Sequence, residues 1–433
     1  MKNASVSIIS FGDRGVAASA AAGRISTGAG TALEAFAKSG DSEKDVKLIG
    51  KVLSSGHNTI IEHMYVTVAF NDVSVLTEQM MIEHRLAAYT VKSRRYVDFS
   101  GAGYLVPEEL GDREPEFRGH MDYLFGVYDR LLGMGVPKED ARFVLPYCFR
   151  SNFIMSADMR EILHVAQGMV QGRLSVYPEI RRLGQQLLDE LTSLFPAAPK
   201  AIGKTGDVKP LKGISGVAEP HPAAPGAEIV SSTPDSAVVL RRALALNGRD
   251  GIAPRQLIRD ERPRELEMLD YTFIIKDVSL AGITHFTRHR IQSLIVPRPM
   301  DALVSNAYVL PESVASNAEA KRIYVEAFGK NALAARAFMD RPELMSYFAL
   351  AGNTLDIMLS MNARELLHFL RLRTCTRAQW EIRALSNEML CLLTEEYREL
   401  FRCYGPSCAV LGYCPEGRLS CGKPRKAEDV DNG

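Results

Sequence analysis

The sequence of 433 residues has no excess of either charge and no long apolar run. Lysine and arginine together number 52, as do aspartate and glutamate, so the chain lacks the basic surplus of proteins that wrap nucleic acid. No apolar stretch reaches the roughly 18–20 residues that span a bilayer. Near the N-terminus, Gly12, Asp13 and Arg14 interrupt the apolar segment too early for a signal peptide. We therefore expect a cytoplasmic protein that binds neither nucleic acid nor membrane.

Cysteine is sparse, and its spacing lacks the close pairs of common zinc sites. In a reducing compartment the seven cysteines are expected to be thiols or ligands, not disulfides. Four of them fall in a short tail, where their spacings of x4, x5 and x6 match no common zinc pattern. We expect no metal there, with a zinc or iron–sulfur site as the alternative. The candidate ligands for that alternative are Cys403, Cys408, Cys414 and Cys421.

Aromatic residues are absent from 197–236, where proline and glycine are concentrated. No helical or strand period is sustained in this stretch, which is typical of a linker. The linker divides the chain into a first domain at 1–196 and a second at 237–402. A cysteine-containing tail at 403–433 follows the second domain.

The two domains resemble each other in the order of their elements, which indicates a tandem repeat. Each begins with an apolar, strand-like run, continues to a basic element and ends with two long amphipathic helices. In the first copy these elements are 65–74, 83–90, 156–170 and 178–195; in the second they are 271–279, 288–295, 362–373 and 378–401. We predict an α+β fold in each copy, with a small antiparallel sheet packed against long helices.

Three motifs of the second copy resemble the flavin-dependent thymidylate synthase family. They are Arg288–His289–Arg290, then NARELLHFLRLR from residue 362 and AQWEIR from residue 378. The family hallmark is R-H-R-x7-S after a strand, followed by an N-x-R…L-R…AQWEI segment. The first copy is similar to the family at other places: GHNTIIEH at 56–63, EHRLAAYTVKSRRY at 83–96 and ARFVLP at 141–146. The chain is thus identified as two diverged tandem copies of this type of domain.

The resemblance implies which residues bind FAD and which bind a pyrimidine nucleotide. Two arginines flanking an imidazole suit a phosphate, because guanidinium donates to its oxygens in pairs. Asn362 begins a helix, where it either caps the helix or assists anion binding. The implied flavin residues are His57, Thr59, Arg288, His289, Arg290, Asn362, Arg364 and His368. The implied nucleotide residues are Gln79, Ser93, Arg94, Arg95, Arg142 and Arg373.

Arg373 matches the position of the family's catalytic arginine. A guanidinium stays protonated and cannot act as an ordinary base. The resemblance instead implies that it stabilises negative charge developing on the pyrimidine ring. A phosphate clamp or a helix-capping cation is the alternative interpretation of this residue.

Each copy lacks part of the family pattern. Glu83 replaces the first arginine of the hallmark in the first copy, and Arg298 replaces the hallmark serine in the second. Family members are homotetramers with active sites between subunits. The complementary losses suggest that the first copy keeps nucleotide-binding residues and the second keeps flavin-binding residues. Two chains would then form a pseudo-tetramer with two composite sites.

The function implied by the resemblance is reductive methylation of dUMP to dTMP. Methylenetetrahydrofolate would supply the carbon, and NADPH the reducing equivalents, with FAD as the cofactor. Two alternatives stay open. One is a flavin enzyme acting on another pyrimidine nucleotide or using another one-carbon donor, which the altered loop at Thr90 and Val91 motivates. The other is a non-catalytic paralogue that binds flavin or nucleotide.

Overall fold

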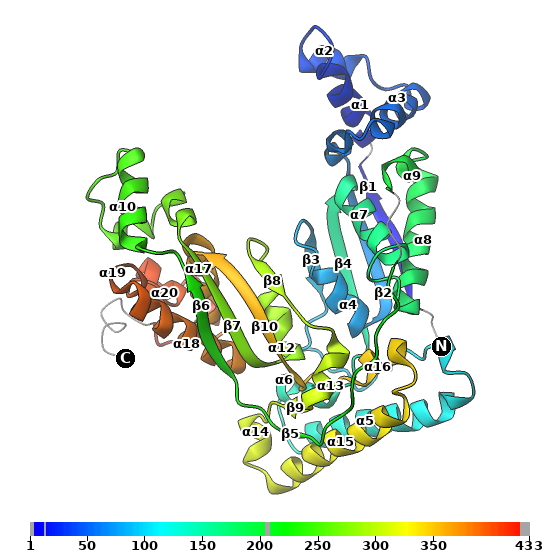
Figure 1. Ribbon diagram of the computed structural model, residues 1–433, viewed down its shortest axis with the longest axis vertical. Helices are drawn as coiled ribbons and strands as arrows, with labels where there is room; N and C mark the ends of the chain where they lie inside the picture. Colours follow the sequence, from blue (N-terminus) through cyan, green and yellow to red (C-terminus); the bar gives the residue numbers. More distant parts are fainter. Residues whose placement is uncertain (1–3, 13, 204–207, 425–433) are drawn as a thin grey trace. The chain divides into compact units, whose positions relative to one another are not determined.

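The computed structural model describes residues 4–12, 14–203 and 208–424, which form two compact units (Figure 1). Unit 1 contains the described residues of Met1–Glu219 together with Pro311–Ala351. Unit 2 contains Pro220–Leu310 and the described residues of Gly352–Gly433. Each unit holds a four-stranded sheet with helices, so the predicted α+β class is confirmed.

Unit 1 is built on an antiparallel sheet of order β1-β2-β4-β3, with helices α7 and α8 packed together beside it. Its strands are β1 (Ser5–Phe11), β2 (Tyr65–Ser74), β3 (Ala88–Val91) and β4 (Arg150–Asp158). Its helices are α1 (Gly15–Ile25), α2 (Ala32–Ala37), α3 (Ser42–Ser54), η1 (Asn58–His63), α4 (Val75–Ile82), η2 (Glu108–Arg113), α5 (Glu114–Gly133), α6 (Lys138–Ala141), η3 (Arg142–Val144), α7 (Met159–Val170), α8 (Pro178–Leu194), α9 (Ala198–Ala201), α14 (Glu312–Ala315), α15 (Ala318–Ala337) and α16 (Pro342–Phe348).

Unit 2 repeats this plan with an antiparallel sheet of order β6-β7-β10-β8. Its strands are β5 (His221–Pro222), β6 (Gly226–Ser232), β7 (Asp270–Ser279), β8 (Ser293–Ile295), β9 (Ala307–Tyr308) and β10 (Thr354–Asn362), of which β5 and β9 form a separate parallel pair. Its helices are α10 (Ser236–Leu246), α11 (Pro254–Leu257), η4 (Arg264–Met268), α12 (Leu280–Phe286), η5 (Pro299–Asp301), α13 (Ala302–Ser305), α17 (Ala363–Arg373), α18 (Trp380–Glu396), α19 (Arg398–Phe401), α20 (Ser407–Leu411) and η6 (Gly417–Leu419).

The repeat extends to backbone detail at the end of the second strand of each sheet. Asp72 of β2 and Asp277 of β7 both have φ of 51°. Aspartate is among the few non-glycine residues that tolerate this left-handed region. The backbone nitrogens of Asp72 and Asp277 donate over 2.9 Å to the side chains of Asn152 and Asp356, respectively. Both copies share this unusual backbone conformation and a side-chain acceptor for the same backbone N–H. This agreement indicates that they are repeats of one fold.

The following helices start in the same way in both copies. Ser74 caps α4, and Ser279 caps α12. Each serine hydroxyl also donates to a buried glutamate of the last long helix, Glu179 in α8 and Glu381 in α18. A serine at the cap satisfies a backbone N–H that the helix leaves without a partner. The arrangement fixes where each helix leaves the sheet, and hence where the basic element after it lies.

The segment Pro311–Ala351 comes from the second copy in sequence but packs in unit 1. Phe117 of α5 contacts Phe338 and Phe348, with ring centroids 6.4 and 5.5 Å apart. His120 Nε2 lies 2.9 Å from Oδ1 of Asn331 in α15, and Asn331 is fully buried. Buried aromatic rings and a satisfied buried amide make this a core contact.

Strand and helix predictions hold with three corrections. Residues 156–158 end strand β4 and do not begin a helix, because they continue the pairing with β2. The helix predicted at 378–401 is interrupted at Tyr397, where φ is −148°. Strand β6 lies inside the stretch predicted as a linker, and it pairs with β7 along its length. Because prolines precede this short run of alternating residues, the sequence pattern there indicated a linker and not a strand.

Candidate functional site

The basic element of unit 2 follows directly on α12. That helix ends at Phe286, and Arg288, His289 and Arg290 come on the turn after it. His289 is buried, whereas both flanking arginines are exposed. The turn therefore anchors itself by the imidazole and presents two guanidiniums to solvent, as an anion-binding element requires.

His289 joins Arg373 to a buried carboxylate. Arg373 Nε donates to His289 Nε2 over 3.1 Å, and His289 Nδ1 lies 3.2 Å from Glu365 Oε1. Because Nε2 accepts from a guanidinium, a neutral ring must carry its proton on Nδ1 and donate it to Glu365. Arg373 Nη2 also donates to the backbone oxygen of His285 over 3.3 Å. The guanidinium of Arg373 is thus held from two sides.

The surroundings keep this cluster at low charge. Burial, followed by the charges of Arg373 and His368, lowers the pKa of His289 to about 2. Burial raises the pKa of Glu365 to about 7, against the opposing effect of His368 and Arg364. The histidine is therefore neutral at physiological pH, and its contact with Glu365 is a hydrogen bond, not an ion pair. Arg373 carries the stable positive charge of the cluster.

The start of α17 brings three other predicted flavin residues into the same unit. Asn362 caps the helix by accepting from the nitrogen of Glu365 over 2.9 Å. Arg364 forms an ion pair with Glu267 of η4. His368 is exposed, and its ring centroid lies 5.5 Å from that of His289. Unit 2 thus gathers the residues predicted from the second copy: Arg288, His289, Arg290, Asn362, Arg364, His368 and Arg373.

The predicted nucleotide residues of the first copy lie in unit 1. Arg94 is buried and forms an ion pair with Glu78 over 2.7 Å. Gln79 is buried next to Glu78, and its Nε2 lies 3.4 Å from Glu83 Oε1. Among the described residues, Nη1 of Arg94 and Oε1 of Gln79 are buried and make no hydrogen bond. Buried polar atoms normally have partners, so these two atoms point to a ligand.

Other predicted nucleotide residues border this region. Arg95 forms an ion pair with Glu139 over 2.6 Å, and Ser93 Oγ accepts from the nitrogen of Arg95. Arg142 is buried, and its Nε donates to the backbone oxygen of Glu139 over 3.0 Å. Glu139 therefore links Arg95 to Arg142, two residues that lie far apart in the sequence.

Sequence reasoning missed Glu78, which organises the region around Arg94. Its carboxylate pairs with Arg94 and also accepts from the hydroxyl of Ser151 in β4. Glu78 is fully buried, and a buried carboxylate is retained only where it is paired. The available signal was a charged residue in the mostly apolar sequence of helix α4.

The first copy keeps the histidine cluster but has no arginine at the positions of Arg288 and Arg373. His84 Nδ1 lies 3.7 Å from Glu161 Oε1, matching the pair of His289 and Glu365. Glu83 stands at the position of Arg288, and burial raises its pKa while Arg173 opposes the change. Counted from the cap of its helix, Met169 of α7 occupies the position of Arg373 in α17. His84 Nε2 correspondingly has no partner among the described residues.

His57 and Thr59, also predicted to bind flavin, lie at the start of η1 in unit 1. Both side chains are exposed. The other predicted flavin residues belong to unit 2, so the structure does not bring the whole predicted set together within one unit.

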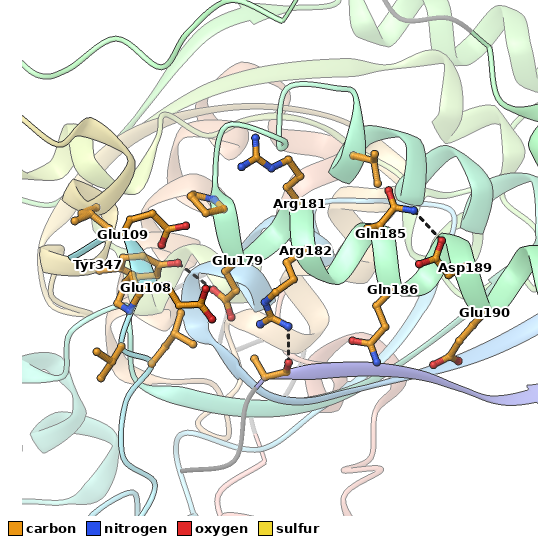
Figure 2. A pocket seen from close by; sticks show the side chains of 17 residues that line it. Glu108, Glu109, Glu179, Arg181, Arg182, Gln185, Gln186, Asp189, Glu190 and Tyr347 are labelled. Atoms are coloured by element: carbon orange, nitrogen blue, oxygen red, sulfur yellow. Dashed lines mark hydrogen bonds between the residues drawn. The ribbon is translucent and has the colours of Figure 1, made fainter. Parts of the chain in front are cut away.

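A cavity of about 840 Å³ opens along α8 of unit 1, and the predicted site residues are absent from its lining (Figure 2). Several of its polar groups already have partners. Arg182 donates to the backbone oxygen of Ala4 over 3.0 Å, and Gln185 donates to Asp189 over 2.8 Å (Figure 2). The hydroxyl of Tyr347 donates to Glu179 over 3.1 Å. The contacts of Arg182 and Tyr347 hold α8 against neighbouring segments of unit 1, whereas that of Gln185 lies within the helix.

The four candidate cysteines of the tail do not all line one cavity. A cavity of about 200 Å³ in unit 2 is lined by Cys375, Cys408, Cys414 and Cys421. Cys403 does not line this cavity but lies in a separate small one with Arg255 and Arg402. All seven cysteines are free thiols. In residues 4–12, 14–203 and 208–424, no three His, Cys, Asp or Glu side chains are placed to hold a metal ion.

None of the helices in the described part of the chain combines the length and apolar character needed to cross a bilayer.

Comparisons with known proteins agree with the repeat. The family model described as thymidylate synthase complementing protein matches twice, at residues 8–197 and 247–397. A flavin-dependent thymidylate synthase of Geobacter sulfurreducens is 39% identical over 165 residues, which are 36% of this chain and 70% of the relative. One of Nitratidesulfovibrio vulgaris is 36% identical over 176 residues, again 36% of this chain and 70% of the relative. A solved structure of the UMP/dUMP methylase PolB from Streptomyces cacaoi is 22% identical, with a TM-score of 0.40, and covers 46% of this chain and 94% of that one.

Proposed function

Because the chain belongs to the thymidylate synthase complementing protein family, we propose that it uses FAD to methylate dUMP at C5. In this proposal methylenetetrahydrofolate donates the carbon, NADPH supplies the reducing equivalents, and dTMP is the product. The observation that carries it is the fixed guanidinium of Arg373, held by neutral His289 and by the backbone of His285.

The residues of unit 2 fit a flavin dinucleotide. Arg288 and Arg290 are exposed cations on one turn, which suits a pyrophosphate. Ile291, beside them, is 69% exposed and offers an apolar surface to a planar ring. His368 and Arg364 add further donors from α17. FAD, when bound, supplies the hydride chemistry, and the protein supplies binding, orientation and electrostatics.

Arg373 acts on the nucleotide by its charge. Its side chain is fixed before the substrate arrives, so stabilising an anionic pyrimidine ring costs little reorganisation. Neutral His289 contributes a lone pair that orients Arg373 without adding a competing charge. Glu365 in turn fixes the tautomer of His289 through Nδ1. The three residues together place one cation against the place where negative charge develops.

Arg94 and Gln79 are the proposed nucleotide contacts of the first copy. Each has one buried polar atom that makes no hydrogen bond within the described residues. The guanidinium suits a phosphate, and the amide oxygen suits an N–H of a pyrimidine ring. Ser93, Arg95 and Arg142 surround them. His57 and Thr59 of the first copy complete the proposed flavin set, so that first- and second-copy residues make up one composite site in a homodimer that mimics a tetramer.

Release of tritium from dUMP labelled at C5 tests the proposal, using the full chain with FAD, NADPH and methylenetetrahydrofolate. We expect release coupled to dTMP formation. Arg373→Ala should lower the rate by about 100- to 1000-fold while the flavin spectrum persists, since it removes one preorganised cation. Arg383→Ala, on the neighbouring helix α18, is the control and should retain the rate.

Two results would overturn the assignment. One is a flavin-loaded protein that releases no tritium from dUMP but turns over another pyrimidine nucleotide. The other is an Arg373→Ala variant that loses flavin and keeps its residual rate per bound flavin, because Arg373 would then be a cofactor ligand.

A further inference from the structure

A cavity of unit 2, which we call the tail pocket, lies between the end of α17 and the C-terminal segment. It is lined by residues 371–373 and 375–378 and by residues of the segment from Ser407 to Pro424. Its volume is about 200 Å³, room for roughly six water molecules at about 30 Å³ each. All of these residues belong to unit 2, so the pocket lies within one unit.

Specific contacts hold the C-terminal segment in this position. Ser407 Oγ donates to the backbone oxygen of Arg371 in α17 over 3.3 Å. The chain then reverses at Gly412, which has φ of 85°, a conformation that glycine adopts without strain. Cys421 hydrogen-bonds to the side chain of Thr376. The segment is therefore fastened near both ends to the region where α17 ends.

The tail pocket carries an excess of positive charge. Arg371, Arg373 and Arg377 line it, and Glu416 is the acidic residue among the described residues of its lining. Arg371 is half-buried, and its guanidinium forms no hydrogen bond or ion pair with the described residues. The dipole of α17 favours a cation in its last turn, but it does not explain three guanidiniums around one cavity. Such a cavity favours an anionic ligand, because guanidinium donates to carboxylate and phosphate oxygens in pairs.

The uncharged part of the lining narrows the class of anion. Cys375 and Cys408 contribute thiols, which pack as small apolar groups. Leu372 is 41% exposed and also lines the pocket. Arginines beside apolar walls suit carboxylates that are joined by a short chain of methylene groups. A glutamyl group has this composition.

Arg373 joins the tail pocket to the cluster that carries the proposed chemistry. Its Nε donates to His289 over 3.1 Å, and its side chain also lines the pocket. A ligand in the pocket therefore lies beside the residue that is proposed to act on the pyrimidine ring. In the proposed function, methylenetetrahydrofolate brings its reactive carbon to that ring, and its glutamyl group is at the other end of the molecule.

We propose that the tail pocket binds the glutamyl carboxylates of a folate co-substrate, with Arg371 and Arg377 as their partners. The inference rests on the proposed function, which supplies the folate. It assigns to the C-terminal segment, which carries four of the seven cysteines, the task of closing a binding site against the end of α17.

A pair of folate compounds tests this assignment by equilibrium binding to the flavin-loaded full chain. Tetrahydrofolate carries the glutamyl group, and tetrahydropteroate lacks it. In anaerobic calorimetry we expect tetrahydrofolate to bind at least about 10-fold more tightly, as for a charge-assisted hydrogen bond. Arg371→Ala should abolish this difference by weakening tetrahydrofolate alone. Arg402→Ala is the matched control, because Arg402 lines a separate small cavity of the same unit, and it should keep the difference.

Glu416→Gln should change the affinity in the opposite direction. It removes the negative charge from the lining, so tetrahydrofolate should bind roughly two- to five-fold more tightly, while tetrahydropteroate is unaffected. A purely structural role of the pocket would not produce a gain. Circular dichroism reports whether Arg371→Ala is folded; if it is not, Arg377→Ala, at an exposed position, provides the same comparison.

Three outcomes would overturn the inference. They are equal affinities of the parent protein for the two compounds, equal losses for both compounds in folded Arg371→Ala, and a loss of NADPH affinity in that variant with folate binding unchanged. The last result would assign the pocket to the 2′-phosphate of NADPH.

The binding experiment is independent of turnover. Tetrahydrofolate binding that depends on Arg371, without tritium release from dUMP, would support the tail pocket and contradict the proposed methylation. Tritium release with equal affinities for the two compounds would do the reverse.

Discussion

At the scale of single residues, His289 couples a cation to a carboxylate through its two ring nitrogens. Its Nε2 accepts from Arg373 and its Nδ1 faces Glu365, so the ring is useful only while it is neutral. Burial and the charge of Arg373 ensure this by lowering the pKa of His289. The first copy shows what remains when the cation is lost, because His84 keeps Glu161 while Met169 stands at the helix position of Arg373.

Glu365 should make the stability of the protein depend on pH. Burial raises its pKa from 4.5 to about 7, so the folded state binds a proton more tightly than the unfolded state. Stability contributed by this group is therefore fully present below pH 4.5 and is lost as the pH rises to about 7. We expect Glu365→Gln, which still accepts from His289, to be more stable than the parent above pH 7.

Urea unfolding at pH 5 and pH 8 measures this effect. The gain in stability of Glu365→Gln should be larger at pH 8. Glu161→Gln, the equivalent change in the first copy, serves as the comparison. A gain that is equal at both pH values would contradict the raised pKa.

The motifs selected residues that the structure brings into one unit, but they did not indicate the buried partners of these residues. Arg288, His289, Arg290 and Arg373 were found from motifs and do lie in one unit. Glu78 was missed because its role depends on tertiary neighbours, Arg94 after β3 and Ser151 in β4. No local sequence pattern indicates which residue will pair with a single charged side chain on a mostly apolar helix.

At the scale of elements, the serine caps of α4 and α12 are equivalent in structure but not in expected function. Ser279 accepts from the nitrogen of Gly282 over 2.9 Å and donates to buried Glu381 over 2.7 Å. Ser74 makes the corresponding contacts with Thr77 and Glu179. Only α12 leads into a turn with two arginines, and so only that cap should influence flavin binding.

Alanine at either cap should destabilise the protein by about 2 kcal/mol, through the lost cap and the lost donor to a buried carboxylate. Ser279→Ala should in addition weaken FAD binding, because the turn after α12 loses its fixed start. Ser74→Ala should leave FAD affinity unchanged. Urea unfolding measures the loss of stability, and a flavin titration measures the affinity for FAD. Equal FAD affinities in the two variants would contradict a specific role of the α12 cap in flavin binding.

Long periodic elements were predictable, whereas short or interrupted ones were not. Strand β2 has the predicted bounds, and β7 differs by one residue, because alternating apolar residues set both faces of each strand. Strand β6 was hidden by the prolines before it, since its pairing with β7 is a long-range property. The break at Tyr397 is likewise invisible in a sequence whose apolar spacing continues through it.

At the scale of the whole molecule, the differences between the two copies lead us to expect one bound flavin per chain. Exposed arginines stand at matched positions, Arg290 in the second copy and Arg85 in the first. Glu83 beside Arg85 opposes an anionic ligand, whereas Arg288 beside Arg290 favours one. Arg290→Ala should therefore weaken FAD binding by roughly 10- to 100-fold, as expected for a charge-assisted hydrogen bond, and Arg85→Ala should not.

Flavin released from purified, fully loaded protein, divided by the chain concentration, gives the stoichiometry. A ratio of two, or equal losses of affinity in Arg290→Ala and Arg85→Ala, would show that the first copy also binds flavin.

The placement of Pro311–Ala351 in unit 1 has a consequence for how the chain is made. A ribosome releases the first segment of unit 1 well before α15 and α16, and the strands β6–β9 of unit 2 emerge in between. Until Phe338 and Phe348 arrive, Phe117 lacks two of the rings against which it packs, although Tyr104 is already present. During synthesis the nascent chain therefore carries an exposed aromatic surface on α5, and this is the period when a chaperone would protect it from aggregation.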